Sequence, residues 1–172
     1  MILREELIEI KEIVTGKVDI TDPSYTGDSS FRISDILLPA GKYELICYKG
    51  WDFEPGEADL VKGTGIDHLK DLRRRVFALV VKKQSNRNIP LSSKRWKKIG
   101  QIGVDSSIAG IFWNPYEFAD DDAWFDFCDE LNGNDVIADD CGFYCNSGYG
   151  DGIYDVFAIK KNDDIIALRI DF

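Results

Sequence analysis

The sequence predicts an α+β fold that is dominated by β-structure, with a mostly antiparallel sheet forming a sandwich or an open barrel and with two short helices. Short apolar runs separated by Gly, Pro, Asn and Asp are typical of strands joined by turns. The final run alternates, which predicts a half-buried hairpin strand with Ile166, Leu168, Ile170 and Phe172 on one face. Chains of this length bury roughly 70% of their unfolded surface. We therefore expect a single domain over residues 1–172.

The N-terminal segment predicts the first helix. Leu3, Leu7, Ile10 and Val14 recur at helical spacing, with charged residues between them. Gly16 is expected to end this helix, because glycine is favoured just beyond a helix C-terminus.

Three strands are expected next, at residues 18–20, 42–48 and 75–82. The first ends at Asp22-Pro23, because proline has no N–H to donate to a strand ladder. The third is apolar on both faces, which indicates a strand inside a sheet. Turn-like or connecting segments are expected at residues 26–36 and 51–72.

The second half is expected to place strands on either side of the second helix. Residues 99–113 predict one or two strands kinked at glycines. The helix begins near Asp120, where acidic residues suit the positive end of the helix dipole, and ends at Gly133. The final hairpin turns at Asn162-Asp163. It is preceded by a sharp turn, where positive φ or close backbone approach is expected at Gly148, Gly150 and Gly152.

Weak self-similarity suggests two similar β units within the domain. Three short patterns recur in the same order in residues 16–81 and 100–172, and they pair Gly16–Ser24 with Gly100–Ser107. Strands of any sheet share such patterns, so internal duplication and chance similarity are both open interpretations.

Composition and charge narrow the class of protein. The sequence is 44% hydrophobic and 30% charged, without an apolar run that could span a membrane or a signal-peptide pattern, so we expect a cytoplasmic protein. The net charge is −10, but residues 73–98 contain ten basic and no acidic side chains. Aromatic residues are nearly absent from this basic segment, which contains only Phe77 and Trp96, and this does not favour nucleic-acid binding. We expect the segment to fold against acidic parts or to be solvated.

Cysteine and histidine give little support for a cofactor site. Cys128, Cys141 and Cys145 could supply part of a zinc site, but no Cys-x-x-Cys pair is present and the only histidine, His68, is distant in sequence. Buried thiols are the favoured interpretation, and we expect no cofactor. His68 is expected to be exposed, and no partner acid or nucleophile can be identified for it.

Three aspartates at turns are candidate metal ligands. If the loops carrying Asp22, Asp105 and Asp151 converge, the carboxylates could hold a hard divalent cation and activate a water. Other candidate loop residues are Ser24, Tyr25, Ser106, Ser147 and Tyr149. The alternative is turn chemistry, because Asp and Ser side chains commonly cap their own backbone turns.

An acidic surface is the basis of a second functional hypothesis. Residues 117–140 are rich in aspartate, which suits binding to a basic protein. The aromatic residues that could anchor such an interface are Trp113, Tyr116, Trp124 and Tyr149. We therefore expect a soluble, non-enzymatic binding module, immunity-protein-like toward a basic partner. The alternative is a divalent-metal-binding hydrolase that uses the carboxylate cluster.

Several motifs together resemble one bacterial family. They are Asp22-Pro23, Pro39-Ala40-Gly41-Lys42-Tyr43, Arg74-Arg75-Val76-Phe77-Ala78, Trp96, Val104-Asp105-Ser106, Ser147-Gly148-Tyr149-Gly150-Asp151-Gly152 with Tyr154, and Asp171-Phe172. In this order and spacing they resemble the bacterial domain-of-unknown-function family 4241 over residues 16–172. The resemblance implies a small bacterial cytoplasmic protein and, by analogy, an interaction or toxin-neutralising module. It implies no catalytic residue, because no activity is established for that family.

Overall fold

The computed structural model describes residues 2–13, 16–25, 31–51, 75–84, 88–114, 118, 120–132 and 134–172. Of the connection expected at residues 51–72, which includes His68, only Trp51 lies within these ranges. Gly133 lies outside them.

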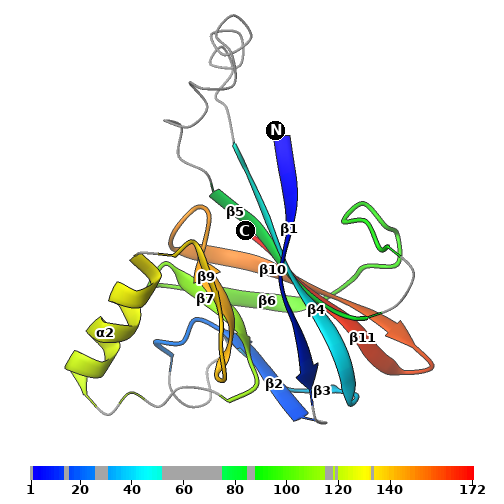
Figure 1. The fold of residues 1–172 in the computed structure, drawn as a ribbon, viewed down its shortest axis with the longest axis horizontal. Coiled ribbons are helices and arrows are strands. Elements are labelled where there is room, and N and C mark those ends of the chain that lie inside the picture. Colours follow the sequence, from blue (N-terminus) through cyan, green and yellow to red (C-terminus); the bar gives the residue numbers. More distant parts are fainter. Residues whose placement is uncertain are drawn as a thin grey trace, which may run out of the picture.

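Two antiparallel sheets make up most of the described chain (Figure 1). Sheet A has six strands in the order β1 (Ile2–Ile13), β4 (Gly41–Trp51), β5 (Arg75–Lys83), β11 (Asp164–Asp171), β10 (Gly152–Lys161) and β6 (Lys97–Val104). Sheet B has five strands in the order β3 (Ile33–Leu38), β2 (Gly16–Thr21), β7 (Ile108–Phe112), β9 (Gly142–Asn146) and β8 (Val136–Ala138). Helix α2 (Asp121–Asn132) is the only helix in the described residues.

The main core lies between the two sheets. Alternate residues of each strand point to one face, and the inward-facing residues of both sheets form one buried cluster. Sheet A contributes Leu45, Leu79 and Leu168 among others, and sheet B contributes Ile20 and Phe143. Burial of this apolar surface is the main force that holds the sheets together.

The outer face of each sheet is covered by a different element. On sheet A, Ile89 and Trp96 lie on a buried cluster that includes Val80 and Ala167, so β5 is buried on both faces as the sequence predicted. Strand β11 is likewise buried on both faces from Ala167 to Ile170, so it is not the half-buried strand that was expected. On sheet B, α2 packs on the outer side of β7 and β9 (Figure 1).

The expectation of an N-terminal helix was wrong, because residues 2–13 form strand β1. A β-bulge between Leu7 and Glu9 explains the helix-like spacing. Every second residue of a strand lies on one face, so Leu3 and Leu7 share a face before the bulge. The extra residue of the bulge then places Ile10 on that same face. The resulting spacing of four and then three residues imitates a helix.

One other expectation needs correction, because the segment expected to be turn-like at residues 26–36 includes the start of β3. For residues 99–113 the sequence left one or two strands open, and the structure has two. They belong to different sheets, β6 to sheet A and β7 to sheet B. The connection between them turns at Ser107, whose φ of 59° lies in the left-handed region.

Apart from β8, the strand order of each sheet is symmetric about a central pair. In sheet A, β1-β4-β5 and β6-β10-β11 meet at the β5–β11 pair, and in sheet B, β3-β2 and β9-β7 meet at the β2–β7 pair. Strands β1 to β5 thus correspond in chain order to β6, β7, β9, β10 and β11. This correspondence places β2 opposite β7, whereas the sequence similarity paired Gly16–Ser24 with residues of β6. The internal duplication itself stays a prediction.

We expect the protein to lose stability between pH 10 and pH 12 through Tyr43. Its side chain is fully buried and its hydroxyl donates to the Pro39 carbonyl at 2.6 Å. Burial, with a smaller contribution from Asp164, raises the pKa of Tyr43 to about 12. Because the folded pKa lies above the unfolded value near 10, the stabilisation is complete below pH 10 and is lost as the pH rises to 12. The loss is about 3 kcal/mol.

Urea unfolding at intervals from pH 8 to pH 12 measures this loss. Tyr43→Phe should unfold more easily at pH 8 but should show a flatter decline above pH 10. An equally steep decline in both proteins would exclude Tyr43 as its source.

Candidate functional site

The loops that carry the predicted aspartates meet at one end of the two sheets. Asp22, in the connection after β2, is fully buried. Its Oδ1 accepts hydrogen bonds from the Ser24 amide at 2.8 Å and the Ser106 hydroxyl at 2.7 Å. Its Oδ2 accepts from the amides of Asp105 and Ser106, both at 2.8 Å. The Asp22 carboxylate therefore joins the connection after β2 to the β6–β7 turn.

The turn between β9 and β10 closes the same end. Ser107 donates its hydroxyl to Asp151 Oδ1 at 2.9 Å, and the Ser147 amide donates to the Ser107 carbonyl at 2.8 Å. Gly150 adopts a φ of 83°, which favours glycine. A Cβ at Gly148 would lie 2.1 Å from the Val76 carbonyl oxygen. Of the three glycines in this turn, one is thus required for its φ and another for close approach of the backbone.

Tyr25 belongs to the same group of loops. Desolvation raises the pKa of its hydroxyl, and the charges of Asp105, Asp22 and Asp151 raise it further, in that order. Its ring stacks on Phe31 with centroids 6.3 Å apart. The structure thus brings the loops that carry the predicted residues to one end of the sheets.

This arrangement is better suited to closing turns than to binding a metal. A carboxylate has about four lone-pair positions, and four protein donors already occupy those of Asp22. The Asp105 and Asp151 side chains are exposed at the surface. Among the described residues, no group of three or more His, Cys, Asp or Glu side chains could hold a metal ion. The geometry fits turn capping, in which aspartate and serine side chains satisfy backbone donors.

The other aromatic and cysteine candidates that the structure describes contact neighbouring side chains or are at least partly buried. Tyr149 is half exposed, and its ring contacts Phe77 edge-on and lies 4.9 Å from the Arg75 guanidinium carbon. Cys145 is buried in the inter-sheet core, where burial raises the pKa of its thiol. Cys128 and Cys141 are partly buried free thiols. Tyr116 lies outside the described residues.

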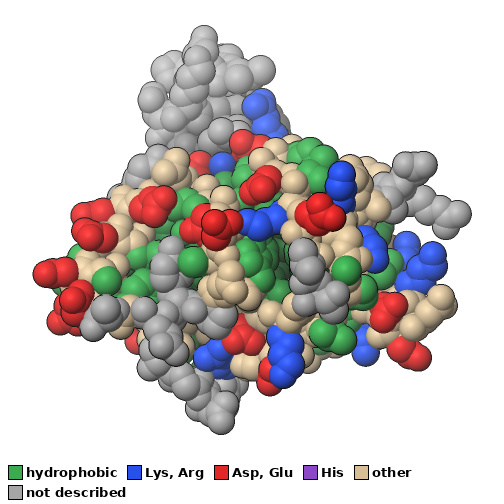
Figure 2. Space-filling model, turned by 60° about the horizontal axis from the view of Figure 1, so that its bottom comes forward, with side chains coloured by type: hydrophobic (Ala, Val, Ile, Leu, Met, Phe, Trp, Pro, Cys, Tyr) green, Lys and Arg blue, Asp and Glu red, His purple; other side chains and the backbone are tan. Residues whose placement is uncertain are grey.

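Helix α2 carries a continuous acidic face. Its Asp120 cap accepts the Ala123 amide at 3.0 Å, as the sequence predicted for the start of this helix. Phe127 and Leu131 pack inward, with Trp124 beside them, while the opposite side projects from sheet B. We call that side the acidic face of α2, and its exposed residues are Asp122, Phe125, Asp126, Asp129 and Glu130. Figure 2 shows acidic side chains gathered at the left end of the molecule, where Figure 1 places α2.

The acidic face is held on a rigid aromatic support. Phe127 stacks on Tyr144 with centroids 5.0 Å apart, and Tyr144 stacks on Phe112 at 5.5 Å. Gly110 makes this packing possible, because a Cβ there would lie 2.4 Å from the Tyr144 Cβ. Trp124, a predicted interface anchor, instead packs on Phe118 and Phe127. The exposed aromatic residue of the helix is Phe125, which the sequence did not distinguish from its neighbours.

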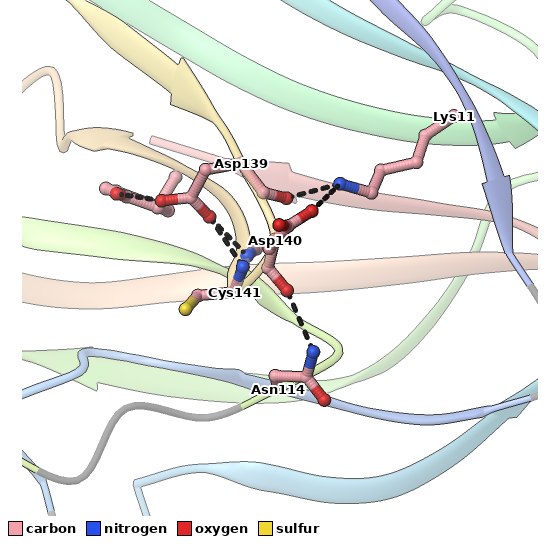
Figure 3. Close-up of polar contacts among 7 residues, drawn as sticks. Lys11, Asn114, Asp139, Asp140 and Cys141 are labelled. Atoms are coloured by element: carbon pink, nitrogen blue, oxygen red, sulfur yellow. Dashed lines mark hydrogen bonds and ion pairs between the residues drawn. The ribbon is translucent and has the colours of Figure 1, made fainter.

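A polar junction connects the β1 edge of sheet A to the β8–β9 turn of sheet B (Figure 3). Lys11 donates to the Asp139 carbonyl and lies 3.4 Å from the Asp140 carboxylate. The Asp139 carboxylate accepts the amides of Cys141 and Gly142 and the Tyr144 hydroxyl. These bonds hold the turn beside β1 and leave Asp139 satisfied, so the junction has a structural role.

A second cation strengthens the same junction. The buried Lys49 ammonium lies 3.2 Å from both Glu6 and Asp135. Burial alone would lower its pKa, but hydrogen bonds to Glu6 and Asp135 and the nearby Cys47 raise the pKa above its ordinary value. Lys49 therefore remains charged and joins the two sheets at neutral pH. No local pattern signals this contact, because it joins residues that are far apart in the chain.

No helix within the described ranges combines the length and apolar composition required to cross a bilayer. The sequence matches no family model, no curated protein and no solved structure.

Proposed function

We infer that the protein is a non-enzymatic binding module, immunity-protein-like in its chemistry, that binds a basic protein partner through the acidic face of α2. The observation that carries this inference is the composition of that face. Four carboxylates and one aromatic side chain recur at positions i, i+3, i+4, i+7 and i+8, which form one stripe along a helix. No basic residue lies within the helix.

Three of the four carboxylates of this stripe are available to a partner. Asp122, Asp126 and Glu130 form no side-chain ion pair with another described residue. Uncompensated like charges on one helix face repel each other, and a basic partner relieves that repulsion. Such charge also accelerates association by steering the partner toward the face.

Phe125 supplies the apolar contact that charge alone cannot. Its side chain is 62% exposed between acidic neighbours. Aromatic residues near the centre of an interface commonly contribute most of the binding energy, because they bury a large area with few rotatable bonds. A partner with an apolar pocket surrounded by lysine or arginine would fit this face.

The position of α2 in the topology supports the same conclusion. The two symmetric sets of five strands form the sheets without it. Helix α2 and β8 lie in residues 113–141 between β7 and β9, whereas the corresponding connection between β2 and β3 is the shorter segment of residues 22–32. Function is commonly carried by elements added to a scaffold.

We expect neutralisation of the acidic face to abolish partner binding. The test compares wild-type protein with the triple variant Asp122→Asn, Asp126→Asn, Glu130→Gln and with Phe125→Ser as immobilised baits in a lysate of the source organism. The matched control, Asp105→Asn, Asp163→Asn, Asp164→Asn, removes as many exposed carboxylates elsewhere. A basic protein should be retained by wild type and control and lost by both α2 variants.

The interaction is then measured with the purified partner. The triple variant should bind at least about tenfold more weakly, which corresponds to about 1.4 kcal/mol. Wild-type affinity should decrease with salt, as expected for interactions between exposed charges. Equal loss in the control variant would show that net charge, and not α2, determines binding and would refute the proposal.

A further inference from the structure

A second interaction surface lies on sheet A, at the edge formed by β1. Strand β1 has twelve residues, pairs with β4 on one side only, and is the terminal strand of its sheet. No described strand pairs with its other side (Figure 1). The outward backbone N–H and C=O groups of such an edge can form hydrogen bonds with a further strand.

The outer face of this edge carries a row of aliphatic side chains. Leu7 is opposite Ile46 in the β1–β4 register, so it lies on the face of sheet A that Ile46 shares with Trp96. Leu3 and Ile10 lie on the same side, and the three are 37%, 54% and 46% exposed in chain order. The buried cluster on this face includes no residue of β1. The row therefore continues an apolar surface beyond the part that is covered.

Charge determines which strand fits this edge. Strand β1 contains four glutamates and two basic residues, so two copies of it would repel each other. Glu9 and Glu12 form no ion pair with another described residue. The bulge next to Glu9 also interrupts regular pairing with an identical strand. A strand that carries lysine or arginine would instead be attracted.

We propose that β1 binds an extended segment of another polypeptide in which aliphatic and basic residues alternate, added as a seventh strand to sheet A. The aliphatic side chains of that segment cover Leu3, Leu7 and Ile10. Its basic side chains point to the opposite face of the sheet, where the register places Glu9 opposite Leu45. Backbone hydrogen bonds along the edge provide affinity, and the alternation provides specificity. This surface lies on the other sheet from α2, and the proposal does not depend on the function assigned to that helix.

The test uses a synthetic eight-residue peptide in which Val and Lys alternate. Its binding is measured by calorimetry, and the site is located by amide hydrogen exchange, which should slow at residues 3–12. The double variant Leu7→Asn, Ile10→Asn should weaken binding at least about tenfold. Leu37→Asn is the matched control, because Leu37 is 59% exposed on the edge strand β3 of sheet B. It should bind within twofold of wild type.

Two further probes separate strand addition from simple charge attraction. A peptide with four Val followed by four Lys has the same composition but cannot present alternate faces, and it should bind at least about tenfold more weakly. Glu9→Gln should reduce affinity and its salt dependence. The proposal is overturned if the alternating peptide does not bind, if both peptides bind equally, if the Leu7 and Ile10 variant binds like wild type, or if protection appears away from β1. Circular dichroism confirms that each variant remains folded.

Discussion

Replacing Asp22 with alanine is expected to destabilise the protein by about 3 kcal/mol. The change removes a fully buried carboxylate and leaves the amides of Ser24, Asp105 and Ser106 without their acceptor. For a chain of this size the midpoint of thermal unfolding should fall by roughly 10 °C. A thermal scan followed by circular dichroism measures it.

Asp105→Ala is the control for this effect. Asp105 belongs to the same loop cluster, but its side chain is exposed and its backbone amide, which contacts Asp22, is unchanged. We expect a change of no more than about 0.5 kcal/mol. Similar losses for the two variants would contradict the assignment of Asp22 as the residue that closes this end of the fold.

Replacing Arg169 with alanine is expected to cost about 3 kcal/mol and to release the segment that covers sheet A. The Arg169 guanidinium lies between the rings of Trp96 and Phe157, at 5.0 and 4.3 Å from their centroids. It donates to the Leu91 carbonyl at 2.7 Å and forms a two-point ion pair with Asp171. Burial already raises the pKa of Asp171, and loss of its cation leaves this carboxyl less stable when charged.

Urea unfolding and tryptophan fluorescence together test this role. Unfolding gives the loss of stability, and emission should shift toward longer wavelength as Trp96, which is 7% exposed, becomes solvated. Lys98→Ala removes an ion pair with Asp155 in which the side chains are 46% and 38% exposed, and it should cost less than about 1 kcal/mol. An Arg169→Ala variant as stable as Lys98→Ala would show that the guanidinium does not hold this segment in place.

Only part of the candidate site could be predicted from the sequence. Asp22, Ser106 and Ser147 were selected as turn residues that could come together, because turn chemistry depends on local residue types. Their roles depend on partners more than forty residues away, such as the Ser106 amide for Asp22. The acidic character of residues 117–140 was also evident, but the exposure of Phe125 and the burial of Phe127 depend on how α2 rotates against sheet B.

Local patterns in the sequence determined the class of fold. Alternation and turn residues predicted β4, β5, β10 and β11, and aspartates at an N-terminus followed by an apolar stripe predicted α2. These signals are local because side-chain direction repeats every two residues in a strand and every 3.6 in a helix. These signals failed for the N-terminal strand, because the bulge after Leu7 gave its exposed aliphatic residues a spacing that resembles that of a helix.

Tertiary structure decided which strands pair, which faces are covered and which edges remain open. Three features show this. Strands β6 and β7 follow each other in the chain but belong to different sheets. The junction at Lys11 and Lys49 and the contact between Arg169 and Leu91 each connect segments that are distant in the chain. Such contacts depend on how the whole set of apolar faces is buried at once, and no single segment encodes that solution. Among the described residues, the edge at β1 and the projecting face of α2 are the surfaces where we propose that partners bind.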